Sequence, residues 1–189
     1  MADGRVALRR RLLAARRAVP AAERTAAAAA IDRALARLGL PKPGTRISAF
    51  HPFDCEIDPA IVLRRAARMG CRIYYPVVTS LRNRRMRFVA CADDAGRDRI
   101  DPRWLDLVLL PLVGFDPRGH RLGMGAGFYD RHFEFLRHRR AWHRPQLVGI
   151  AFEAQKVARL AEAAHDVQLD GIVTERAVYG RIAGAWGTG

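Results

Sequence analysis

The sequence has no apolar run long enough to cross a membrane. A membrane-spanning helix needs roughly 20 mostly apolar residues, and the longest candidates, at 26–31 and 107–113, are far shorter. We therefore expect no transmembrane segment and no membrane partner.

Cysteine is also scarce. The three cysteines, at 55, 71 and 91, are widely spaced and odd in number. They match neither the paired spacing of a zinc site nor a disulfide framework, so a reducing environment is the default. We expect a cytoplasmic protein.

Lysine is nearly missing. Of the 33 basic residues only Lys42 and Lys156 are lysine, and the formal net charge is +14. Arginine and alanine in place of lysine are typical of a GC-rich genome, and the arginines are spread along the chain. Basic motifs interleaved with aromatic residues, which stack on single-stranded bases, are not evident. We expect nonspecific attraction to polyanions and no specific nucleic-acid partner; a basic RNA-binding protein is the alternative from another functional class.

The length of 189 residues, half of them apolar, suits one compact domain over 1–189. Hydrophobic periodicity predicts the secondary structure. The expected helices lie near 8–19, 31–38, 58–69, 127–138 and 156–162, and the expected strands near 45–50, 72–75, 85–91, 106–113, 147–152 and 171–174. This alternation predicts an α/β sandwich with a largely parallel sheet.

Proline and glycine set the predicted boundaries. Asp58 can cap a helix whose first position is Pro59, where the missing N–H is not needed. Pro76 is predicted to end the strand before it. In such sheets ligands bind beyond the carboxyl ends of the strands, which indicates the loops at 51–58, 114–130 and 153–170.

The most informative segment follows the strand at 106–113. It contains Gly123, Gly125 and Gly127, with Arg121 before the glycines and Asp130 after them. Glycine-rich loops can present backbone N–H groups to a phosphate. This loop lacks the Lys-Ser/Thr of a Walker loop and the last spacing of a dinucleotide fingerprint. The glycines alone therefore leave a plain surface turn open, and the neighbouring charges favour a phosphate site.

The segment from Pro111 to Arg131, read as PLVGFDPRGHRLGMGAGFYDR, resembles the signature of the 5-formyltetrahydrofolate cyclo-ligase family, also called 5,10-methenyltetrahydrofolate synthetases. Other stretches agree in order and spacing. They are Arg5–Arg9, Phe50–Asp58, Val148–Gln155 and His165–Asp170, so that the resemblance covers about residues 5–176.

The resemblance implies a single-domain three-layer α/β/α sandwich and an ATP-dependent, Mg²⁺-requiring ligase. The implied reaction converts 5-formyltetrahydrofolate and ATP to 5,10-methenyltetrahydrofolate, ADP and phosphate. The formyl oxygen takes the γ-phosphoryl group, and N10 then closes the ring as phosphate leaves. The implied partners are these two small molecules, and we expect a monomer. A paralogue that kept the fold and lost activity is the alternative within the family.

The resemblance also implies roles for individual residues. Arg121 and Asp130 are the implied catalytic residues, and Asp130 and Asp166 are the implied Mg²⁺ ligands. The implied ATP-binding residues are Arg5, Arg9, Arg121, Leu122, Gly123, Met124, Gly125, Ala126, Gly127, Phe128 and Tyr129. The implied folate-binding residues are His51, Glu56, Met124, Gly125, Gly127 and Phe128.

The residue types suit these roles. Arg5 and Arg9 are four residues apart and share one helix face. Glu56 can accept hydrogen bonds from a pterin ring, and Mg²⁺ prefers hard carboxylate oxygens. Structural alternatives remain: a solvated basic helix face, loop or helix-start acids, and core packing of Phe128 and Tyr129.

Overall fold

The computed structural model describes residues 2–91, 98–138, 144–161 and 166–182. An eight-stranded sheet has the order β10-β9-β8-β5-β1-β2-β3-β4. These strands are β1 (Arg46–Ser48), β2 (Arg72–Ser80), β3 (Arg85–Ala90), β4 (Arg99–Ile100), β5 (Leu107–Pro111), β8 (Gln146–Ile150), β9 (Gly171–Val173) and β10 (Val178–Gly180). Strands β2, β1, β5, β8 and β9 are parallel, whereas β3, β4 and β10 pair antiparallel at the two edges.

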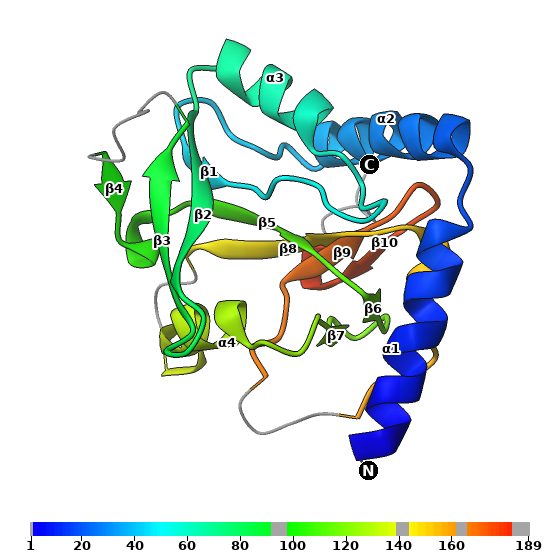
Figure 1. Ribbon diagram of the computed structural model, residues 1–189. Helices are drawn as coiled ribbons and strands as arrows, with labels where there is room; N and C mark the ends of the chain where they lie inside the picture. The colour runs from blue at the N-terminus through cyan, green and yellow to red at the C-terminus, as the bar shows by residue number, and fades with distance from the viewer. Residues whose placement is uncertain (1, 92–97, 139–143, 162–165, 183–189) are drawn as a thin grey trace.

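Helices cover both faces of the sheet (Figure 1). One layer contains α2 (Ala21–Arg37) and α3 (Ala60–Arg68), and the other contains α4 (Phe128–Phe133) with the 3-10 helix Glu134–His138. The central strand β5 contributes Leu107 and Leu109 to the first core and Val108 and Leu110 to the second. Because β5 is buried on both faces, it is a continuous apolar run. The predicted α/β sandwich with a mostly parallel sheet is confirmed.

The first helix, α1 (Ala2–Arg17), stands beside the carboxyl ends of the strands, next to the small hairpin of β6 (Gly114–Phe115) and β7 (Arg121–Leu122) (Figure 1). Leu12 anchors it by packing with Val113, Leu122 and Leu160. A β-carbon at Gly114 would lie 2.3 Å from Leu12 Cδ1, so a larger residue there would displace the Leu12 side chain. The packing places the basic face of α1 over the edge where ligands bind in α/β sheets.

The boundary predicted at Pro76 is wrong, because β2 runs on to Ser80. Strand β1 pairs with β2 only as far as Tyr74, and beyond it β2 pairs with β3 alone. A proline is tolerated where a strand has a free edge.

The helix predicted near 156–162 is also wrong over 156–161; residue 162 lies outside the described residues. The backbone there is held by the β6 turn instead. Val157 N–H donates to the Phe115 carbonyl at 2.9 Å, and Leu160 N–H donates to Asp116 Oδ2 at 3.0 Å. The 3-10 helix Glu153–Gln155 precedes this extended segment.

Within the described part of the chain, no helix is both long enough and apolar enough to span a membrane.

Candidate active site

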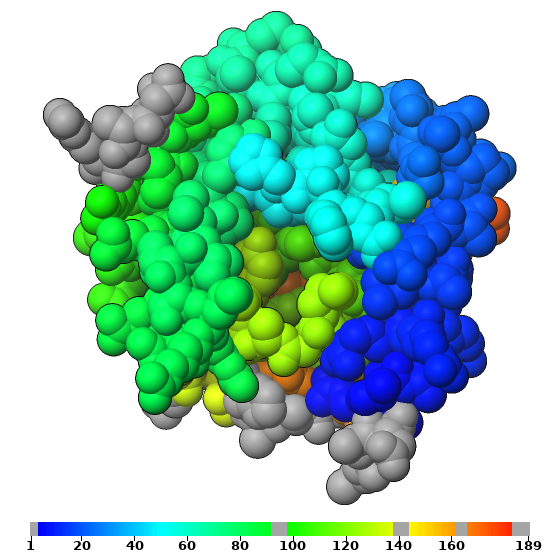
Figure 2. Space-filling model, viewed as in Figure 1, coloured from blue at the N-terminus to red at the C-terminus, as the bar shows by residue number. Residues whose placement is uncertain are grey.

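A cavity of about 530 Å³ lies beyond the carboxyl end of β5. Figure 2 shows the hollow between α1, the loop after β1, the β2–β3 hairpin and the glycine loop. Its lining contains all the predicted site residues except His51: Arg5, Arg9, Glu56, Arg121, Leu122, Gly123, Met124, Gly125, Ala126, Gly127, Phe128, Tyr129, Asp130 and Asp166. Segments far apart in the sequence therefore converge on one cavity.

The glycine loop needs glycine at two of its three positions. Gly125 and Gly127 have φ angles of +99° and +67°, which side chains with a β-carbon rarely adopt. A β-carbon at Gly123 would meet no atom within 4 Å. Arg9 holds the loop from α1, because its Nε donates to the Gly123 carbonyl at 2.9 Å. The loop is thus shaped by its backbone and fastened by a cation.

Arg121 and Asp130 form a largely buried ion pair. The Arg121 side chain is 7% exposed and that of Asp130 is 22% exposed. Arg121 Nη2 donates to Asp130 Oδ1, and Val167 N–H donates to the same oxygen at 3.0 Å. Burial lowers the pKa of Arg121 from its usual value, and Asp130 and Asp166 oppose that shift. Arginine stays charged in this setting, so a cation is fixed beside the glycine loop.

Asp130 and Asp166 are the residues that could hold a divalent cation. Both line the cavity. Among the described residues Asp130 Oδ2 has no hydrogen-bond donor, and Arg5 Nη2 lies 3.5 Å from Asp166 Oδ2. No cluster of three or more His, Cys, Asp or Glu residues with ligand geometry occurs in the described part of the chain. Two carboxylates fit Mg²⁺, which keeps several waters and takes its remaining ligands from phosphate oxygens.

Glu56 enters the cavity from the loop after β1. Its Oε1 accepts from Arg16 Nη1 at 3.2 Å, and its Oε2 accepts from the Phe53 N–H at 3.1 Å. Burial raises the pKa of Glu56, and the Phe53 and Arg16 hydrogen bonds oppose this rise. Glu56 therefore presents an acceptor group to a ligand in the cavity.

Phe128 and Tyr129 both line the cavity and pack against the core on the α4 side of the sheet. The Tyr129 ring stacks on Phe133 with centroids 6.4 Å apart. Burial raises the pKa of Tyr129 well above its usual value, so its hydroxyl stays protonated. Phe128 and Tyr129 thus pack against the hydrophobic core and also form part of the cavity wall.

The structure does not bring His51 into the cavity lining. Its ring stacks on Tyr75 with centroids 4.0 Å apart. A role for His51 in folate binding stays a prediction.

The sequence predictions missed four residues that line the cavity, Val6, Pro111, Leu112 and Val113, and they also missed Arg16, which contacts Glu56 from outside the lining. Arg16 lies seven residues after Arg9 and hence on the same face of the helix. The seven-residue spacing indicates that Arg16 faces the same way as Arg9, but the many other arginines in this helix make that spacing hard to recognise.

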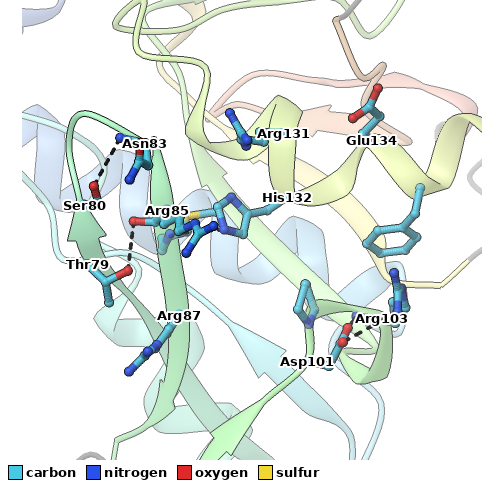
Figure 3. A pocket seen from close by; sticks show the side chains of 13 residues that line it. Thr79, Ser80, Asn83, Arg85, Arg87, Asp101, Arg103, Arg131, His132 and Glu134 are labelled. Carbon is cyan, nitrogen blue, oxygen red and sulfur yellow. Dashed lines mark hydrogen bonds and ion pairs between the residues drawn. The ribbon is translucent and has the colours of Figure 1, made fainter.

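A second, more open hollow of about 820 Å³ lies along α4 and β3 (Figure 3). Figure 3 shows His132 reaching from α4 toward the β2–β3 hairpin. Both ring nitrogens are engaged: Nε2 accepts from the Met86 N–H at 3.1 Å, and Nδ1 lies 2.8 Å from the Phe128 carbonyl. His132 thus fastens α4 to the sheet. None of the predicted site residues lines this hollow, so the candidate site is the cavity at the glycine loop.

Comparison with known proteins shows which family the chain resembles. Residues 2–175 match the model of the 5-formyltetrahydrofolate cyclo-ligase family. The chain is 30% identical to the 5-formyltetrahydrofolate cyclo-ligase of Escherichia coli K12 over 148 residues, which are 70% of this chain and 79% of that protein. It is 31% identical to the enzyme of the same name from Mycoplasma pneumoniae over 171 residues, covering 89% of this chain and 97% of that protein.

Solved structures give the same result. The 5,10-methenyltetrahydrofolate synthetase from Mycoplasma pneumoniae superposes with a TM-score of 0.76 at 29% identity, covering 90% of this chain and 98% of that one. The Aquifex aeolicus 5,10-methenyltetrahydrofolate synthetase has a TM-score of 0.74 at 24% identity, which supports the fold alone. By these matches the chain belongs to the 5-formyltetrahydrofolate cyclo-ligase family.

Proposed function

We propose that this protein converts 5-formyltetrahydrofolate to 5,10-methenyltetrahydrofolate, with ATP as the co-substrate and Mg²⁺ as the metal ion. The observation that carries the proposal is the single cavity in which the glycine loop, three arginines, two aspartates and Glu56 meet. Phosphoryl transfer needs charge neutralisation and alignment more than a covalent nucleophile. The cavity supplies groups of that kind, and the family match indicates the substrate.

The glycine loop and its arginines are the proposed phosphate site. The backbone of residues 123–127 lines the cavity, and the fixed Arg121 stands at its edge. Arg9 uses Nε to hold Gly123, which leaves its two terminal nitrogens for a phosphate. Arg5 borders the same space from α1. These cations would offset the charge on the transferred group.

Asp130 and Asp166 are the proposed Mg²⁺ ligands. When bound, the ion would offset the negative charge that develops on the transferred phosphoryl group. Arg121 keeps Asp130 in place through Oδ1 and leaves Oδ2 for a ligand. Arg5 Nη2 lies 3.5 Å from Asp166 Oδ2 and holds Asp166 beside the cavity.

Glu56, Phe128 and Tyr129 are the proposed folate contacts. The Glu56 carboxylate would accept hydrogen bonds from pterin N–H groups. The two aromatic rings border the cavity and would cover a flat ring.

In the proposed reaction the formyl oxygen attacks the γ-phosphorus, and the bond to ADP breaks. N10 then attacks the formyl carbon and loses its proton, while the formyl oxygen leaves as part of phosphate. The chain's contribution is to bind both substrates in one cavity, orient the two reacting atoms and exclude water.

The experiment is direct. Purified protein is mixed with 5-formyltetrahydrofolate and Mg-ATP, and the methenyl chromophore is followed by absorbance. We expect product only when ATP is present. Absence of ATP-dependent product in a folded sample would favour the inactive paralogue.

The free thiols of Cys55, Cys71 and Cys91 support the proposed cytoplasmic location, since such thiols persist where the environment is reducing. We propose that the enzyme acts as one domain and as a monomer. No nucleic-acid role is proposed.

A further inference from the structure

Among the described residues, Arg16 is the largest side chain that is completely buried. It lies in the last turn of α1, and its side chain is 1% exposed. Its Nε–H has no hydrogen-bond partner among the described residues. Burial of an N–H group without a hydrogen-bond partner is unfavourable. A bulky apolar residue would therefore be more favourable at this position if packing were its only role. The presence of a guanidinium here indicates a role beyond packing.

The terminal nitrogens of Arg16 hold the loop after β1. Nη1 donates to Glu56 Oε1 at 3.2 Å and to the Leu112 carbonyl at 3.5 Å, and Nη2 donates to Asp54 Oδ2 at 3.1 Å. Leu112 follows β5 and lines the cavity. Arg16 therefore joins α1, the loop after β1 and the segment after β5 behind the cavity wall.

The loop is in an unfavourable conformation where Arg16 holds it. Asp54 and Cys55 have φ angles of +50° and +63°, which few residues other than glycine adopt. A strained backbone conformation persists where many surrounding contacts hold it in place, and such positions are typically found at functional sites. The strained pair directly precedes Glu56 and sets the direction in which its side chain leaves the loop.

We propose that Arg16 is a positioning residue that fixes Glu56 as an ionised, acceptor-only carboxylate facing the cavity. Each Glu56 oxygen already takes one donor from the protein, Arg16 on Oε1 and the Phe53 N–H on Oε2. The remaining lone pairs suit a ligand edge that offers N–H donors. This inference rests on the proposed function, in which Glu56 binds the pterin.

Other charged and titratable groups near Glu56 define the pH test. Asp54 lies on the same loop and opposes ionisation of Glu56, whereas Arg16 on α1 favours it. Tyr129 on α4 interacts electrostatically with Glu56. Arg121 lines the same cavity. Arg16 is the cation that touches Glu56, so its removal should let Glu56 take up a proton at higher pH.

The test compares Arg16→Gln with Arg17→Met. Arg17 is the next residue on α1, is 59% exposed and pairs with Asp54 but not with Glu56. We expect Arg16→Gln to raise the KM for 5-formyltetrahydrofolate about tenfold, which is the range for a lost hydrogen bond to a charged group. The KM for ATP should change little. Arg17→Met should behave like the unmodified protein.

The pH profile separates positioning from general damage. In Arg16→Gln the acidic limb of kcat/KM for folate should move to higher pH, and in Glu56→Gln that limb should disappear. Arg16→Lys should recover part of the folate affinity. The double variant Arg16→Gln/Glu56→Gln should lose no more folate affinity than Glu56→Gln alone.

Three results would overturn the proposal: an unchanged acidic limb in a folded Arg16→Gln variant, equal losses for folate and ATP, or additive losses in the double variant. If Arg16→Gln does not fold, Arg16→Met, which also removes the cation, takes its place under the same three criteria. Failure of the proposed function itself would be seen separately, as no turnover by the unmodified protein.

Discussion

Replacement of Asp130 by asparagine removes one negative charge and almost no volume. Asp130 Oδ1 accepts from Arg121 Nη2 and from the Val167 N–H. Asparagine keeps an acceptor for the Val167 N–H but leaves the Arg121 cation, which is 7% exposed, without its counter-charge. The change therefore tests the charge of Asp130 rather than its shape.

The expected cost follows from the burial of the pair. Removal of one partner from a fully buried ion pair costs about 3–5 kcal/mol. Asp130 is 22% exposed, and asparagine retains one hydrogen bond, so we expect about 2 kcal/mol. For a chain of this length that loss lowers the unfolding temperature by roughly 4–8 °C. Turnover should fall about 100-fold, the scale for losing one preorganised electrostatic group.

The assay measures thermal unfolding and turnover against Mg²⁺ concentration, with Asp106→Asn as the matched control. Asp106 is also largely buried and ion-paired, with Arg46 and Arg144, but it precedes β5 at the opposite end from the cavity. Asp106→Asn should lose stability and keep its turnover per folded molecule. Normal turnover and normal Mg²⁺ dependence in Asp130→Asn would refute the assignment of Asp130 to the site.

Three further predictions test the loop, the fold and the charge. Gly125→Ala should lower the unfolding temperature by a few degrees and raise the KM for ATP. The reason is that φ at this position is +99° and the new β-carbon would lie 3.4 Å from Arg9 Nη2. The control variant Gly123→Ala should unfold at an unchanged temperature. Burial tends to raise the pKa of Asp116, but hydrogen bonds from Leu160 and Arg118 leave it below the usual value. The stabilisation from ionised Asp116 should thus be complete above about pH 4 and be lost as the pH falls further. In acid titrations of unfolding, Asp116→Asn should therefore lose less stability than the unmodified protein. An equal loss would exclude Asp116 as a source of the acid sensitivity. Binding to RNA should disappear at moderate salt, as nonspecific attraction does, and salt-resistant binding would favour a nucleic-acid role.

Local patterns were the predictable part of the fold. The apolar run at 107–113 predicted a strand, and the structure shows that this strand, β5, is buried on both faces of the sheet. The extension of β2 beyond Pro76 was not predictable in this way, because the tolerance for proline depends on which strands flank it. Residues 156–161 have a helix-compatible composition, yet their N–H groups bond to Phe115 and Asp116 far away in the sequence. Tertiary hydrogen bonds there override local preference.

The site was predictable where a motif marked it. The glycines, Arg121 and Asp130 stood out by spacing and meet in the cavity. Arg16 did not stand out, because its role depends on burial and on the approach of Glu56, neither of which an arginine-rich helix reveals. His51 belongs to the motif, but its ring stacks on Tyr75 outside the cavity lining, so its role in folate binding stays a prediction.

The proposed function requires that the γ-phosphoryl group of ATP is transferred to the formyl oxygen in this cavity. The most direct test uses 5-formyltetrahydrofolate labelled with a heavy oxygen isotope in its formyl group and measures the mass of the released phosphate. We predict that the phosphate carries the label and forms in equal amount with the methenyl product. Unlabelled phosphate, or methenyl product formed without ATP, would contradict the account.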